Sequence, residues 1–116
     1  PHGDQRKLEV ALLMALEPEV FMFDEPTAGM SVDEAPVILA LIEAIKADRS
    51  KTVLLVEHKL DVVRSLADRI VVLHQGELVA DGLPAEVMAS AVVRSAYLGE
   101  DVDQDGAEDL GAGEGA

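Results

Sequence analysis

The chain has 116 residues, of which 49% are hydrophobic, and its 23 acidic and 9 basic side chains give a formal net charge of −14. This length allows one domain with a packed core. The absence of cysteine excludes disulfides and thiolate metal sites. The negative charge opposes binding to nucleic acid or an anionic lipid surface. We expect no direct membrane insertion, because no apolar run approaches the ~20 residues that cross a bilayer.

The charge separates two parts of the chain. Residues 1–99 hold sixteen acidic and nine basic side chains, whereas residues 100–116 hold seven acidic side chains and no basic one. The second part has too few apolar residues to offset the entropy lost on ordering. We therefore predict an ordered domain over residues 1–99 and a disordered acidic tail over residues 100–116, with an acidic interaction arm as the alternative.

Helices and strands are expected to alternate in the first half of the chain. Apolar residues at helical spacing predict a largely buried helix over residues 5–16. Residues 20–23 form a short apolar run that predicts a buried strand. A loop over residues 26–32 leads into a second helix that runs to about residue 46. Residues 52–56 are apolar and rich in β-branched side chains, which predicts a strand buried on both faces.

The second half continues this alternation and then changes to a hairpin. The pattern predicts a helix over residues 59–67 and a third strand over residues 69–73. A Gln-Gly turn leads to an antiparallel strand over residues 77–80, and residues 84–97 form a final helical segment. The predicted fold class is α/β: a parallel sheet with helices on both faces, followed by a carboxyl-terminal β-hairpin and helix.

Two adjacent carboxylates, Asp24 and Glu25, follow the first predicted strand, and Pro26 ends it. One carboxylate of such a pair can bind a metal ion while the next polarises a water, as nucleoside-triphosphate hydrolysis requires. His58 follows the next strand of the expected sheet and can donate a hydrogen bond to a terminal phosphate. Ligands of parallel sheets bind beyond the carboxyl ends of the strands, so we expect these side chains around one pocket. The plain alternative is a polar turn after a strand.

The first residues predict an anion site. Pro1, His2, Gly3 and Asp4 form a glycine-containing turn that opens into a helix at Gln5. Backbone amides at a helix start, reinforced by the helix dipole, favour a phosphate.

Taken in order, these motifs resemble the carboxyl-terminal half of an ATP-binding-cassette (ABC) ATPase, over residues 1–99. Residues 1–7 resemble the end of the signature motif, and residues 21–25 resemble the Walker B strand with its catalytic glutamate. Residues 26–31 follow as the D-loop, and residues 54–58 resemble the switch-histidine segment. Each motif is weak alone, but the four occur in the family's order and at similar separations.

Three narrower patterns resemble the importers of branched-chain amino acids or urea. The first is Pro-x-Gly-x-Gln-Arg-x-Leu-Glu at the amino terminus, and the second is Glu57-His58 followed by Val62-Val63. The third is Ala-Tyr-Leu-Gly at residues 96–99.

The resemblance implies roles for individual residues in an ATPase that uses ATP and Mg²⁺. Asp24 is expected to act on Mg²⁺, Glu25 to polarise the hydrolytic water and His58 to contact the γ-phosphate. Ser31 lies in the D-loop. The residues expected to face ATP on the opposite subunit are Pro1, His2, Gly3, Asp4 and Gln5.

The resemblance also implies partners and a location. In this family two ATPase subunits face each other head to tail and drive transmembrane permease subunits. We therefore expect a second ABC ATPase subunit and permease subunits as partners, no nucleic acid, and a cytoplasmic location at the inner face of the plasma membrane.

The chain departs from the family pattern at three points. The phosphate-binding loop, Gly-x-x-x-x-Gly-Lys-[Ser/Thr], does not occur in the sequence. Because this loop supplies most phosphate contacts, we interpret the chain as the carboxyl-terminal piece of a longer subunit, inactive by itself. Ser31 replaces the D-loop aspartate and Asp4 the usual glutamine, which weakens both assignments. The alternatives are a non-transport ABC head domain of the chromosome or DNA-repair type, and a catalytically silent binding module.

Overall fold

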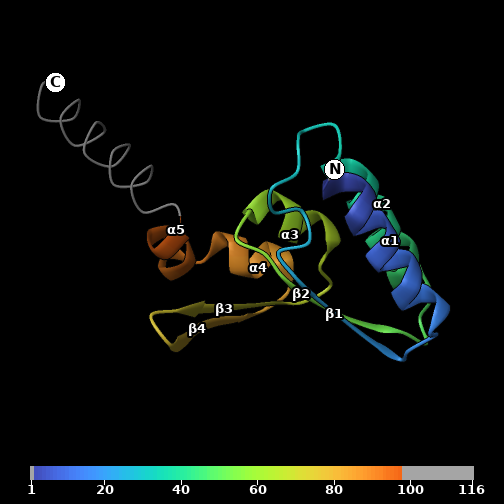
Figure 1. Ribbon diagram of the computed structural model, residues 1–116. Helices are drawn as coiled ribbons and strands as arrows, with labels where there is room; N and C mark the ends of the chain where they lie inside the picture. Colours follow the sequence, from blue (N-terminus) through green and yellow to red (C-terminus); the bar gives the residue numbers. More distant parts are fainter. Residues whose placement is uncertain (1, 98–116) are drawn as a thin grey trace, which may run out of the picture. The chain divides into compact units, whose positions relative to one another are not determined.

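A computed structural model describes residues 2–97 of the chain, and the predicted acidic tail lies outside these residues (Figure 1). The described residues divide into two compact units, one over residues 2–63 and the other over residues 64–97. Each unit has its own two-stranded sheet. The elements in order are α1 (His2–Ala15), β1 (Val20–Asp24), α2 (Ala35–Ala47), β2 (Thr52–Val56), α3 (Leu60–Leu66), β3 (Ile70–His74), β4 (Glu77–Gly82), α4 (Pro84–Ala89) and α5 (Ala91–Tyr97).

The first unit contains a parallel strand pair connected through α2. Strands β1 and β2 pair in register from Val20 opposite Thr52 to Asp24 opposite Val56. Helices α1 and α2 lie side by side (Figure 1). A parallel pair requires a long crossover between its strands, which α2 supplies here. Both strands therefore end at the same edge of the sheet.

Helix α2 packs through one apolar stripe. Ile38, Ile42 and Ile45 are buried, at the i, i+4, i+7 spacing of one helix face. Each buried side chain of this size contributes about 1.5–3 kcal/mol by leaving water. The stripe explains why α2 stays folded between the two strands that it connects.

The second unit is built on an antiparallel hairpin. Strands β3 and β4 pair from Ile70 opposite Gly82 to His74 opposite Glu77, with an irregularity after Val72. The two residues of the turn, Gln75 and Gly76, have φ angles of 51° and 79°. Positive φ at both positions is the requirement of the two-residue hairpin turn whose twist matches the strands. The predicted hairpin is confirmed.

The α/β class, the parallel strands and the flanking helices are confirmed, but two helix boundaries and the pairing of one strand differ from the prediction. Helix α1 already includes His2, Gly3 and Asp4, so the predicted turn at these residues is wrong. The last helical segment is two helices, because Ser90 adopts an extended conformation between α4 and α5. Serine is among the residues favoured at the start of a helix. Among the described residues, strand β3 pairs with β4 and does not extend the parallel sheet.

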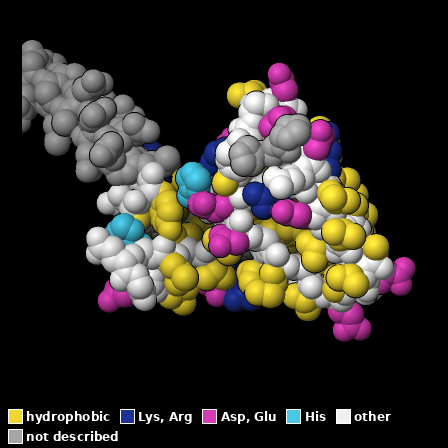
Figure 2. Space-filling model, viewed as in Figure 1, with side chains coloured by type: hydrophobic (Ala, Val, Ile, Leu, Met, Phe, Trp, Pro, Cys, Tyr) yellow, Lys and Arg dark blue, Asp and Glu magenta, His cyan; other side chains and the backbone are white. Residues whose placement is uncertain are grey.

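The prediction that the strands are buried on both faces is wrong. Phe21 and Phe23 are buried in β1, but Met22 between them points to the opposite, open face. Side chains alternate across a strand, and the large apolar side chains of β1 and β2 on this open face are 51–70% exposed: Val20, Met22, Leu54 and Val56. Apolar side chains at the molecular surface are visible in yellow in Figure 2.

Helix α1 is also less buried than predicted. Val10 is buried, whereas Leu8 and Leu12 are exposed, as is Leu16 directly after the helix. A helix that packs against a single neighbour buries only the narrow stripe that faces it, and the only extensive helix neighbour of α1 in the described unit is α2. Within residues 2–97, no helix has the length and apolar character needed to cross a membrane.

Candidate functional site

The carboxyl ends of β1 and β2 place the predicted site residues on two neighbouring segments. Beyond β1 the backbone turns at Glu25, which has a φ of 46°. The left-handed region is uncommon for residues other than glycine, and costs roughly 1–2 kcal/mol. The backbone N–H of Glu25 donates to the carbonyl of Val56, 2.8 Å away. This bond connects the turn after β1 to the end of β2.

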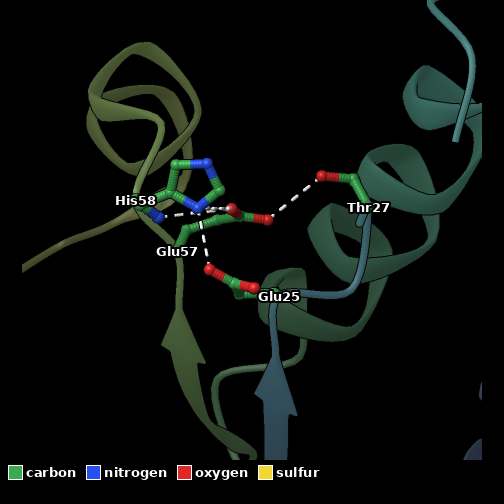
Figure 3. Close-up of polar contacts among 4 residues, drawn as sticks. All are labelled: Glu25, Thr27, Glu57 and His58. Atoms are coloured by element: carbon green, nitrogen blue, oxygen red, sulfur yellow. Dashed lines mark hydrogen bonds and ion pairs between the residues drawn. The ribbon is translucent and has the colours of Figure 1, made fainter. Parts of the chain in front are cut away.

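Glu25 and His58 contact each other directly. The His58 Nδ1 atom lies 2.8 Å from the Glu25 Oε1 atom, although the two residues are 33 positions apart (Figure 3). This distance is typical of a hydrogen bond to an ionised carboxylate. Both side chains remain open to water, with 45% of Glu25 and 64% of His58 exposed. The second carboxylate oxygen of Glu25 is therefore available to a further hydrogen-bond donor.

A second contact lies beneath this exposed pair. The Thr27 hydroxyl donates to Glu57 Oε2 at 3.1 Å, and the His58 backbone N–H donates to Glu57 Oε1 at 3.3 Å (Figure 3). The Glu57 side chain is 1% exposed and Thr27 is 2% exposed. A buried carboxylate thus connects the segment after β1 with the segment after β2.

Asp24 ends β1 with an exposed side chain. Its carboxylate has no hydrogen bond or ion pair to any other described residue. The described residues contain no group of three or more His, Cys, Asp or Glu side chains arranged to hold a metal ion. Mg²⁺ is commonly bound by one or two carboxylates together with phosphates and waters, and this donor set fits that mode of binding.

Ser31 has a structural role in this fold. The Ser31 hydroxyl accepts from the Glu34 backbone N–H, and the Glu34 carboxylate accepts from the Ser31 backbone N–H, at 3.2 and 3.3 Å. These reciprocal bonds have the Ser-x-x-Glu pattern of a capping box and close the turn over residues 31–34 that precedes α2. The Ser31 side chain is therefore engaged in the turn that leads into α2.

The residues at the start of α1 form no described cluster with Glu25 and His58. Gly3 is buried, and a β-carbon there would lie 3.0 Å from the Glu34 carboxyl carbon, so glycine permits this close packing. Asp4 is exposed and pairs with Lys7 at 3.8 Å, and Gln5 is exposed. Pro1 and the His2 side chain lie outside the described part of the structure.

The sequence analysis did not identify Thr27 and Glu57 as functional. Each lies within a segment that resembles a family motif: Thr27 in residues 26–31, two positions after Glu25, and Glu57 in residues 54–58, immediately before His58. A carboxylate at the end of an apolar strand is itself a signal, because burying a charge requires a partner.

Comparisons with known proteins agree with these motifs. A model of the family described as "Branched-chain amino acid ATP-binding cassette transporter" matches residues 77–103. The high-affinity branched-chain amino acid transport ATP-binding protein BraF of Pseudomonas aeruginosa is 42% identical over 99 residues. The corresponding protein LivG of Escherichia coli is 40% identical over 99 residues. In both pairs the alignment covers 85% of this chain and 39% of the relative, so the chain spans about two fifths of their length.

A solved structure extends the agreement to the fold. The ADP conformation of an ATP-binding cassette of an ABC transporter matches with a TM-score of 0.70 and 28% identity, over 84% of this chain and 39% of that one. The apolar faces left open in the first unit are consistent with a match to only part of a larger domain. The resemblance drawn from the sequence motifs is confirmed. Over 85% of its length the chain is similar in sequence to branched-chain amino acid transport ATP-binding proteins, and its fold is similar to that of an ATP-binding cassette of an ABC transporter.

Proposed function

We propose that this chain is the carboxyl-terminal part of the ATP-binding subunit of an ABC importer, which couples Mg-ATP hydrolysis to the uptake of branched-chain amino acids or urea-like solutes. The observation that carries the proposal is the 2.8 Å contact between Glu25 and His58 at the ends of two parallel strands. It brings a carboxylate and an imidazole to the edge of the sheet where ligands of such folds bind.

Glu25 and His58 take different parts in the reaction. Oε1 of Glu25 is engaged by His58, so Oε2 accepts the hydrogen bond from the attacking water and polarises it. As the imidazolium, which carries an N–H on both ring nitrogens, His58 donates from Nδ1 to Glu25 and from Nε2 to the γ-phosphate. The two side chains therefore act on the same reacting group from adjacent strands.

Asp24 is the proposed contact to Mg²⁺. Its free, exposed carboxylate at the end of β1 suits a metal that retains waters and shares phosphate oxygens. When bound, Mg²⁺ neutralises charge on the phosphates. The chain's own contribution is one carboxylate oxygen held at a fixed strand end.

The similarity to transport ATP-binding proteins extends the proposal to partners. A second ABC ATPase subunit binds head to tail, and permease subunits hold the pair at the inner face of the plasma membrane. Residues 1–5, four of which begin α1, face ATP held by the opposite subunit. Ser31 is not assigned a nucleotide contact, because its bonds in the turn before α2 explain its position.

The test is a chimera in which the corresponding part of E. coli LivG is replaced by this chain and assembled with the other subunits of that transporter. We expect Mg²⁺-dependent phosphate release. Glu25→Gln should lower turnover by roughly 10²–10³-fold, while ATP affinity stays within about twofold, because it removes a catalytic carboxylate and not a binding contact.

Glu19→Gln is the matched control, since Glu19 is an exposed carboxylate at the opposite end of β1. It should leave turnover unchanged. A chimera that binds ATP and assembles but releases no phosphate would favour the silent binding module. Normal turnover in Glu25→Gln would contradict the role of Glu25.

A further inference from the structure

The proposed reaction does not use the most buried polar contact of the first unit. Thr27 and Glu57 meet at 3.1 Å, and both side chains are almost completely removed from water. Neither can reach a ligand in solvent. A buried carboxylate is costly unless it is hydrogen-bonded, so this contact requires an explanation beyond chance packing.

The two carboxylate oxygens of Glu57 accept from two different residues, one on the segment after β1 and one directly after Glu57 itself. Oε2 accepts from the Thr27 hydroxyl on the segment after β1, and Oε1 accepts from the His58 backbone N–H. Oε1 also lies 3.8 Å from the His58 ring nitrogen Nδ1. One side chain therefore fixes the backbone that carries His58 relative to the backbone that carries Glu25.

The exposed Glu25–His58 bond is too weak to set this geometry by itself. Hydrogen-bonded charge pairs open to water contribute little, because water screens them and both side chains lose freedom. A hydrogen bond to a buried carboxylate is more favourable, and breaking it leaves an unsatisfied group. The buried contact is thus the stronger of the two links between the segments.

We propose that Thr27 and Glu57 are positioning residues, which hold His58 in the orientation that contacts Glu25. The inference rests on the proposed function for its effect on turnover, but its structural part concerns only the described residues of this chain. Thr27 and Glu57 act through His58 and do not touch the nucleotide.

The main test is Thr27→Val, which removes the hydroxyl and preserves the shape of the side chain. In the LivG chimera, kcat should fall roughly ten- to a hundredfold, the effect expected when the support of a reacting group is lost, with the KM for ATP unchanged. Thr27→Ser keeps the hydroxyl and should restore most of the turnover. Thr52→Val is the matched control, because Thr52 is the exposed first residue of β2.

A double-variant comparison separates positioning from general stability. In a His58→Ala background, Thr27→Val should change kcat by less than about twofold, because the residue through which it acts is gone. Equal losses in both backgrounds would overturn the proposal. So would an unchanged kcat in Thr27→Val when Glu25→Gln lowers it, a result that leaves the proposed function intact. If Glu25→Gln has no effect, the proposed function fails instead.

A second readout does not require turnover. In the 116-residue chain without nucleotide, three-bond NMR couplings should report one χ1 rotamer for His58. Thr27→Val should give averaged couplings and Thr27→Ser should keep the wild-type values. Unchanged couplings in Thr27→Val, with circular dichroism showing a folded protein, would contradict the positioning role.

Discussion

The two compact units of this chain hold their polar contacts in different ways. In the first unit, the contacts that matter join residues 30 and 33 positions apart, across the ends of parallel strands. In the second, the bidentate pair of Arg69 and Asp81 spans 12 positions of an antiparallel hairpin. The Tyr97 hydroxyl, which donates to the Leu73 carbonyl, attaches α5 to the same hairpin.

The proposed site and the match to the family model therefore lie in different parts of the chain. A parallel pair places the carboxyl ends of both strands at one edge, so side chains distant in sequence converge there. The hairpin brings together only residues that are near in sequence. The match to the branched-chain amino acid family model, residues 77–103, begins in the second unit, whereas Asp24, Glu25 and His58 lie in the first.

The largest expected effect compares one histidine from each unit. In the LivG chimera, His58→Ala should lower turnover by roughly 10²-fold, because a preorganised hydrogen-bond donor is lost. His74→Ala, at the end of β3, should leave turnover within about twofold. Phosphate release measured on both variants checks this. A larger loss of turnover in His74→Ala than in His58→Ala would indicate that the hairpin takes part in the reaction. It would contradict the difference between the two units.

The next effect tests the packing of the first unit. Ile42→Ala removes a side chain that is 1% exposed and should cost about 2–5 kcal/mol of unfolding free energy. Val37→Ala on the same helix truncates an exposed side chain and should cost much less. Urea unfolding of the 116-residue chain followed by circular dichroism measures both. Equal costs would mean that the Ile stripe of α2 is not its buried face.

A smaller effect tests the turn of the second unit. Gly76→Ala forces a β-carbon into a backbone with a φ of 79°, which should destabilise the chain by about 1 kcal/mol. Gln75→Asn should stabilise it slightly, because asparagine tolerates positive φ better. The shift of the urea midpoint in each variant gives the sign. An increase in stability in Gly76→Ala would contradict a turn with positive φ at Gly76.

The smallest effect concerns pH. Hydrogen bonds from Arg69 lower the pKa of Asp81 below its usual value. A carboxylate with a lowered pKa stabilises the folded state above its unfolded pKa, and this contribution is lost as pH falls through the lowered pKa. The stability difference between wild type and Asp81→Asn should therefore be small at pH 7 and vanish in acid. A difference that grows on acidification would contradict the ion pair.

The local sequence patterns predicted the positions of the helices and strands well, but they predicted the solvent exposure of the side chains poorly. The strand over residues 52–56 agrees with β2 in both bounds, because an uninterrupted apolar run is a strong local signal. Exposure depends on neighbours, and the exposed Met22 and Leu54 resemble core residues in sequence. The break at Ser90 was missed, because the apolar spacing continues across it.

The site was also predicted only in part, because local patterns identify residues at strand ends but not the contacts between distant segments. Asp24, Glu25 and His58 follow strands directly, and the rule that ligands bind at the carboxyl ends of parallel strands placed Glu25 and His58 together. The Thr27–Glu57 contact could not be derived in this way. It depends on the turn at Glu25, whose positive φ gives no clear signal in the sequence.

The most direct test of the account is the protonation state of the His58 ring in the 116-residue chain. An ionised carboxylate only accepts hydrogen bonds, so the contact with Glu25 requires the proton on Nδ1. Nitrogen-15 NMR of neutral His58 should show a protonated Nδ1, and Glu25→Gln should change its signal while Glu19→Gln does not. A ring protonated on Nε2 alone, and unaffected by Glu25→Gln, would contradict the convergence of the two strand ends.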